Sequence, residues 1–149
     1  EARVDLAFID GMHRFEYVLR DFCNVERWCG PTSTIILHDC LPVAPSAALP
    51  ARQSRFWVGD CWKAVECLIA YRPDLTLTTL PCYPSGLIVV RGLDPASRIL
   101  GERLPELTHQ FAERPYPYAP GTWPAAYRVV DNSAAGLAHA LGLAPTAGS

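Results

Sequence analysis

Several features common in membrane proteins and nucleic-acid-binding proteins are missing from this sequence. No apolar run approaches the length of a membrane-spanning helix, and the first residues do not form a charged segment followed by an apolar one, as a secretory signal does. Basic residues are not in excess, because 13 lysines and arginines stand against 15 aspartates and glutamates. We therefore expect no membrane partner, no nucleic-acid partner and a cytoplasmic location.

Paired cysteine motifs are also absent. The chain has six cysteines, but no two of them form a Cys-x-x-Cys pair, and all fall inside expected helices or beside expected strands. A buried free cysteine behaves as a small apolar residue, so this distribution favours reduced thiols over a disulfide framework or a zinc site.

Two apolar strands, each followed by an acid, organise the chain. The first covers Val4 to Ile9 and precedes Asp10, and the second begins near Thr34 and precedes Asp39. Between them, residues 14–29 carry apolar side chains at steps of three and four, which predicts a helix with one buried face. Such a crossover makes the two strands parallel, so both acids leave the sheet at the same edge.

The carboxyl ends of these strands form the candidate site, because ligands of open α/β sheets bind in the crevice beyond them. Asp10, His13, His38 and Asp39 would gather there. Both acids could instead accept backbone N–H bonds at turns, and His13 could bond a backbone carbonyl at a helix start. His38 should alternate away from Asp39, which favours a core histidine over a site residue.

The rest of the first 93 residues completes a mixed sheet. Gly59-Asp60 should cap a helix that runs to Tyr71, because proline at position 73 disfavours its continuation. Strands at 75–80 and 87–90 are separated by only six residues, so they must be antiparallel. With 149 residues, half of them hydrophobic, one ordinary domain is expected.

Two segments are predicted with less regular structure. The proline-rich residues 41–53 form a long loop over the site edge, the kind that is commonly either functional or disordered. Residues 94–149 form a C-terminal extension with a helix at 96–112, a Pro/Tyr-rich passage at 114–120, an apolar segment at 127–130, a helix from a cap at 131–133 to Leu141, and a frayed end. We expect this extension either to cover a sheet face or to form a homodimer contact.

The first strand lacks a polar face, the pattern of a strand that is covered on both sides and paired on both edges. Nothing before Val4 in this sequence can pair with its outer edge. Either the chain is the C-terminal part of a longer protein or a second copy covers that edge, and we favour the former.

Three motifs together resemble a known family. They are Phe8-Ile9-Asp10-Gly11-Met12-His13, Ile36-Leu37-His38-Asp39 and Gly59-Asp60-Cys61-Trp62-Lys63. In order and spacing they are similar to the C-terminal half of class I S-adenosylmethionine-dependent methyltransferases, and within these to a small-molecule O-methyltransferase-like group with a Phe-Ile-Asp-Gly-x-His motif. The resemblance covers residues 4 to about 93. It implies an α/β fold with a partial Rossmann-like sheet, whose parallel strands end in an antiparallel hairpin and whose N-terminal strands are missing.

The resemblance also implies an activity and its residues. It implies methyl transfer from S-adenosylmethionine to a small hydroxylated acceptor, with Asp10 and Gly11 at the cofactor. The acids Asp10 and Asp39 would bind a divalent cation such as Mg²⁺, which lowers the pKa of a bound hydroxyl. His13 would be catalytic together with Asp10 and would take the proton of the acceptor.

Substrate contacts are predicted for three further residues. His38, Trp62 and Lys63 are the candidates, although Trp62 could belong to the core and Lys63, the only lysine of the chain, could be solvated. An alternative function is a catalytically silent or truncated module of the same fold that binds or oligomerises. It is favoured by the absence of a Gly-x-Gly-x-x-Gly turn, by Met12 where the family has an acid, and by Cys40 where an oxygen ligand is common. A nucleotide-linked dehydrogenase has no motif here.

Overall fold

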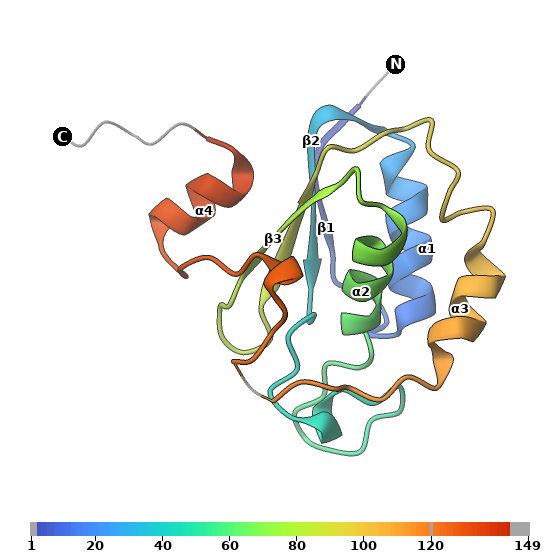
Figure 1. The fold of residues 1–149 in the computed structure, drawn as a ribbon, viewed down its shortest axis with the longest axis vertical. Helices are drawn as coiled ribbons and strands as arrows, with labels where there is room; N and C mark the ends of the chain where they lie inside the picture. Colours follow the sequence, from blue (N-terminus) through green and yellow to red (C-terminus); the bar gives the residue numbers. More distant parts are fainter. Residues whose placement is uncertain (1–2, 120, 144–149) are drawn as a thin grey trace.

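A computed structural model describes residues 3–119 and 121–143 of the chain (Figure 1). Its regular elements are β1 (Val4–Ile9), α1 (Phe15–Glu26), β2 (Cys29–His38), α2 (Trp62–Tyr71), β3 (Thr76–Leu80), β4 (Leu87–Arg91), α3 (Leu104–Ala112) and α4 (Ala134–Leu141). Short 3-10 turns, η1 and η2, occur at Pro45–Ala47 and Ala125–Tyr127. Among the described helices, none has the length and hydropathy of a membrane span.

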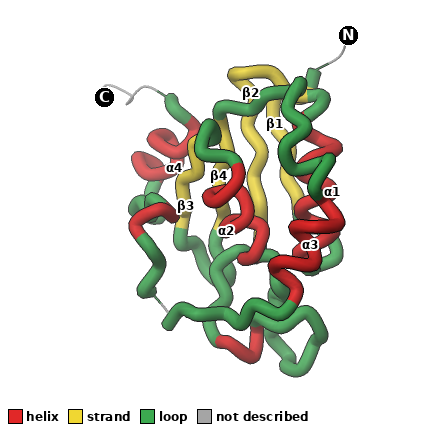
Figure 2. The backbone as a smooth tube through the Cα atoms, turned by 45° about the vertical axis from the view of Figure 1, so that its right-hand side comes forward, coloured by secondary structure: helices red, strands yellow, loops and turns green. Residues whose placement is uncertain are grey.

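The four strands form one mixed sheet in the order β1-β2-β4-β3. β1 and β2 are parallel, whereas β4 is antiparallel to both β2 and β3. The predicted α/β fold, with a parallel pair followed by an antiparallel hairpin, is confirmed and is consistent with a partial Rossmann-like sheet. Because β4 is antiparallel to β2 and its first residue pairs with His38, the turn that joins β3 to β4 comes to the same edge as the end of β2 (Figure 2).

Helices cover the two faces of the sheet unequally. α1, α2 and α3 lie together on one face, and α4 packs near β3 and β4 on the other (Figure 1). The main core includes residues from the sheet, the three helices and the C-terminal extension, among them Leu19, Phe22, Ile35, Leu37, Val65, Leu68, Leu107, Phe111 and Tyr127. A smaller cluster joins Leu80 and Val89 to Ala140 of α4. The predicted domain division at residue 93 stays a prediction.

The prediction was wrong about where α1 ends and β2 begins. The helix stops at Glu26, and the segment from Cys29 to Ser33, which was expected to be the helix end and a turn, is already extended. The Ser33 hydroxyl explains this, because it donates to the carbonyl oxygen of Val4 (2.6 Å) and accepts from the Gly30 N–H (2.7 Å). These two bonds bridge the irregular start of the β1–β2 pairing.

The helix predicted at 96–112 is shorter than expected and begins at Leu104. The preceding residues form turns instead, because the Asp94 carboxylate accepts from the Ala96 N–H (2.9 Å), a local bond that competes with helix. The predicted last helix is confirmed as α4, whose cap is Ser133, with its hydroxyl 3.1 Å from the Gly136 nitrogen. The predicted frayed segment after position 143 lies outside the described residues.

All six cysteines are free, as predicted. The first strand differs from its predicted environment within the described residues, because β1 pairs with β2 alone and leaves Leu6 and Phe8 exposed. A partner for this edge stays a prediction.

The prediction that Gly59 and Asp60 cap α2 was wrong. These two residues instead fix the start of α1. The Asp60 carboxylate accepts from the Phe15 N–H (2.8 Å), and the Asp60 N–H donates to the His13 carbonyl oxygen (3.2 Å). Lys63 completes the contact, with its Nζ 3.0 Å from the other carboxylate oxygen of Asp60 and 2.7 Å from the carbonyl oxygen of Ala112. The turn before α2 therefore holds the loop that carries His13.

Gly59→Ala tests this contact. Gly59 has φ +69°, and a Cβ there would overlap the His13 carbonyl oxygen, so we expect the free energy of unfolding to fall by at least about 3 kcal/mol. Gly121→Ala is the matched control, since φ is +77° and the space is open; its cost should stay near about 1 kcal/mol. Urea denaturation measures both. Equal losses would mean that backbone strain alone, rather than the contact with His13, explains the effect.

Candidate active site at the carboxyl ends of β1 and β2

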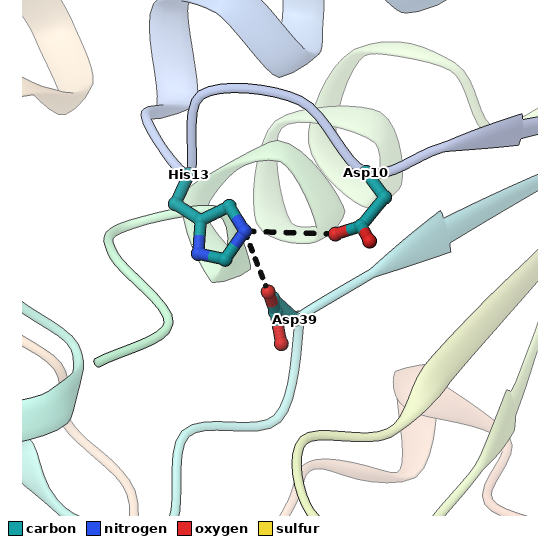
Figure 3. A group of neighbouring side chains, drawn as sticks. All are labelled: Asp10, His13 and Asp39. Atoms are coloured by element: carbon teal, nitrogen blue, oxygen red, sulfur yellow. Dashed lines mark ion pairs between the residues drawn. The ribbon is translucent and has the colours of Figure 1, made fainter. Parts of the chain in front are cut away.

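Three side chains that follow the two parallel strands converge on one point. The Nε2 atom of His13 lies 3.1 Å from Oδ2 of Asp39 and 3.6 Å from Oδ1 of Asp10 (Figure 3). Asp10 follows β1, Asp39 follows β2, and His13 lies in the loop that leads to α1. The parallel strand pair therefore brings these residues together, as the sequence predicted.

The backbone is strained at two of these residues. His13 has φ 53° and Asp39 has φ 59°, both in the left-handed region that residues other than glycine rarely adopt. Such conformations cost about 1–3 kcal/mol each and persist where the surroundings fix them. At His13 the fixing contact is the hydrogen bond from Asp60 to its carbonyl oxygen. Strain of this kind is concentrated at functional sites, which supports a role for this edge of the sheet.

His38 points into the site, so the prediction of a core histidine was wrong. Its Nδ1 atom lies 3.0 Å from Oδ1 of Asp10 and 3.5 Å from Oδ1 of Asp39, and 27% of its side chain is exposed. The predicted alternation between His38 and Asp39 requires a regular strand. The left-handed conformation of Asp39 breaks that regularity at the strand end, so both side chains face the same side.

Ser85, which the sequence analysis did not single out, supports Asp39 from the turn between β3 and β4. Its buried hydroxyl donates to Oδ1 of Asp39 and lies 3.4 Å from Nε2 of His38. The Ser85 carbonyl oxygen accepts from the Leu41 N–H (2.8 Å), which ties this turn to the chain after Asp39. No sequence pattern marks a single serine in a turn, because its role depends on the strand order.

Trp57, from the long loop after β2, was also missed. Its indole stacks on the His13 ring with centroids 5.4 Å apart and planes 22° apart, and its Nε1 donates to the carbonyl oxygen of Leu49 (2.7 Å). Nδ1 of His13 is buried and has no hydrogen-bond partner among the described residues. Without a cation, the proton of a neutral His13 ring is assigned to Nε2, which faces the Asp39 carboxylate; a cation held by Nε2 would require this proton to move to Nδ1.

Other predicted site residues lie elsewhere. Trp62 is buried, with its Nε1 donating to the carbonyl oxygen of Ala48 (3.3 Å), and Lys63 is buried against Asp60. Neither side chain presents a surface to a ligand at the site. Gly11 and Met12 are exposed in the loop after β1.

Cys40 follows Asp39 but is turned into the core. Its thiol contacts the carbonyl oxygen of His38 (3.2 Å), and burial raises its pKa well above the ordinary value. The thiol therefore stays protonated and does not join the carboxylates as a ligand.

The Asp10, His13 and Asp39 side chains have the chemistry of a cation site. One ligand atom from each lies within 4.8 Å of the others. Among the described residues, neither acid forms an ion pair with lysine or arginine, and Asp39 is buried. Two carboxylates without a permanent positive partner, next to an imidazole nitrogen, suit a divalent cation.

Comparison with known protein families gives a match to the first part of the chain. A family model described as a methyltransferase domain matches residues 1–40, the segment that contains β1, α1, β2, Asp10, His13 and Asp39. This match supports a methyltransferase domain. No curated protein and no solved structure matches the chain.

Ser85→Ala tests the support of Asp39. The substitution removes a donor from a buried carboxylate, so we expect the free energy of unfolding to fall by about 1–3 kcal/mol. Ser97→Ala is the control, because the Ser97 hydroxyl is buried without a hydrogen-bond partner among the described residues, so its removal leaves no partner unpaired and should not lower the free energy of unfolding. Urea denaturation compares the two variants. Equal effects would contradict a specific role for Ser85.

Proposed function

We propose that this chain takes part in methyl transfer from S-adenosylmethionine to an oxygen atom of a small hydroxylated acceptor. In this proposal the chain supplies the acceptor and metal edge of the site. The observation that carries the proposal is the convergence of Asp10, His13 and Asp39 within the segment that matches a methyltransferase domain. Asp10 and Gly11 are the residues we assign to cofactor binding.

A divalent cation is the second part of the proposal. Asp10, Asp39 and His13 would hold it, and it would lower the pKa of an acceptor hydroxyl bound beside it. Mg²⁺ prefers ligand sets made of oxygen, whereas Mn²⁺, although also a hard ion, accepts an imidazole nitrogen such as that of His13 more readily. The donor set therefore supports Mn²⁺ over Mg²⁺.

The reaction sets the tasks of the side chains. S-adenosylmethionine supplies the methyl group, whose bond to sulfur breaks as a bond to the acceptor oxygen forms, and the acceptor loses one proton. The protein must hold the acceptor oxygen in line with the methyl carbon and take up that proton, tasks that provide most of the acceleration. Asp10 and Asp39 orient the acceptor molecule for this transfer.

Two contacts favour His38 over His13 as the group that takes the proton. The Asp10 carboxylate, 3.0 Å from Nδ1 of His38, holds a proton on that nitrogen and leaves the lone pair on Nε2. Exposure does not separate the two rings, because the side chains of His38 and His13 are 27% and 29% exposed. Nε2 of His13, by contrast, faces the Asp39 carboxylate, and its Nδ1 is buried. We therefore assign His13 as a ligand of the cation and His38 as the group that takes the acceptor proton.

Manganese titration tests the ligand assignment without an acceptor. Asp10→Asn, Asp39→Asn and His13→Gln should each weaken Mn²⁺ binding at least about tenfold in calorimetry, because each removes a ligand. His38→Gln and the control Asp5→Asn, an exposed acid of β1, should change it less than about threefold. The unchanged chain should bind Mn²⁺ more tightly than Mg²⁺.

Three results would contradict parts of this assignment. Unchanged binding in both Asp variants would remove the cation site, and unchanged binding in His13→Gln alone would remove His13 from it. A preference for Mg²⁺ would favour a site made of oxygen ligands.

Titration of the full-length gene product with S-adenosylhomocysteine tests the cofactor binding that methyl transfer requires. Binding that weakens in Asp10→Asn but not in Asp5→Asn would support the proposal. No binding would favour the alternative, a catalytically silent module of this fold, which the lack of a Gly-x-Gly-x-x-Gly turn in these residues already favours.

A further inference from the structure

An apolar pocket of about 210 Å³ lies beside the candidate site. It is lined by three segments that are distant in the sequence: the chain just after Asp39, the turn between β3 and β4, and the C-terminal extension. Leu41 and Val43 represent the first segment, Cys82 and Gly86 the second, and Gly121 and Trp123 the third. No charged residue is among the described residues that line this pocket.

The wall of the pocket is continuous with the support of Asp39. Leu41 follows Asp39 by two residues, and its N–H donates to the carbonyl oxygen of Ser85, the residue that also bonds the Asp39 carboxylate. Gly86, the next residue, has φ +71°, and a Cβ there would overlap the Leu41 side chain. The contact of Leu41 with Ser85 and Gly86 therefore shapes the pocket wall and also helps to hold Asp39 beside the pocket.

The C-terminal extension is fixed against this wall. The Tyr116 hydroxyl donates to the carbonyl oxygen of Pro42 (3.2 Å), and the Tyr116 ring packs edge-on against the buried Trp62 with centroids 5.3 Å apart. Trp123 follows in the same segment and lines the pocket. The extension lies outside the resemblance described above, so this wall is a feature of the present chain.

We propose that this pocket binds the neutral, ring-sized apolar part of the methyl acceptor and directs its hydroxyl toward Asp39. This inference rests on the proposed function. The size fits, because an apolar cavity of about 150 Å³ holds benzene. Without a charged lining, a carboxylate or ammonium group would lose its hydration without gaining a partner, so the pocket selects against charged rings. The indole of Trp123 offers an aromatic ring a favourable packing surface.

Protection of Cys82 from alkylation tests the pocket independently of methyl transfer. Of the other cysteines, four are buried, and burial raises the pKa of Cys23 to about 11, so iodoacetamide at about pH 8 should modify Cys82 first. Saturating p-cresol should slow this modification at least about fivefold, as followed by peptide mass spectrometry. The charged analogue 4-hydroxybenzoate should not protect.

Val43→Asp should abolish the protection, because it brings a charge to the pocket wall. Ile99→Asp is the matched control, since Ile99 is 48% exposed, close to the 45% of Val43, and it lies outside the pocket. As a second measurement, the indole N–H resonance of Trp123, assigned with Trp123→Phe, should shift on p-cresol addition in the unchanged chain and in Ile99→Asp, but not in Val43→Asp.

The outcomes separate this inference from the proposed function. An unshifted Trp123 resonance in the unchanged chain would overturn the pocket inference, whatever the reactivity of Cys82. Equal protection by 4-hydroxybenzoate would overturn the neutral ligand class. Protection by p-cresol without any binding of S-adenosylhomocysteine to the full-length protein would keep the pocket as a ring-binding site and overturn methyl transfer.

Discussion

The contact between the Gly59-Asp60 turn and His13 is the constraint on which the rest of the structure depends. The Asp60 carboxylate accepts from the first N–H of α1 and pairs with Lys63 at the start of α2, while its own N–H bonds the His13 carbonyl oxygen. A buried ion pair stabilises a fold only when further hydrogen bonds satisfy both charges. Here those bonds come from two helix starts and the end of α3, so helix packing and the position of His13 are set together.

The site draws on both halves of the sheet. The parallel pair brings Asp10 and Asp39 to one edge, but the antiparallel hairpin supplies Ser85, which supports Asp39. Since β4 is antiparallel to β2, this turn borders the end of β2. A sheet with only parallel strands would offer the two acids but not the hydroxyl that orients one of them.

Sequence patterns predicted the structural features that are determined by residues close together in the chain. Apolar periodicity located the strands and α1, and the six-residue connection required an antiparallel hairpin. The meeting of Asp10 and Asp39 followed from the parallel crossover. The direction of His38 depended on the left-handed Asp39, and the roles of Asp60 and Trp57 depended on contacts with residues more than 40 positions away. No local pattern carries such information.

The burial of Lys63 has a consequence for the surface of the protein. Lys63 is the only lysine of the chain and is enclosed by Asp60 and Ala112, so the permanent positive charges of the exposed side chains are all guanidinium groups. Guanidinium groups stay protonated even in alkaline solution and bind carboxylates through two parallel hydrogen bonds. The cationic surface therefore keeps its charge when amines would lose theirs, and cross-linkers that react with amines find no exposed side chain to attack.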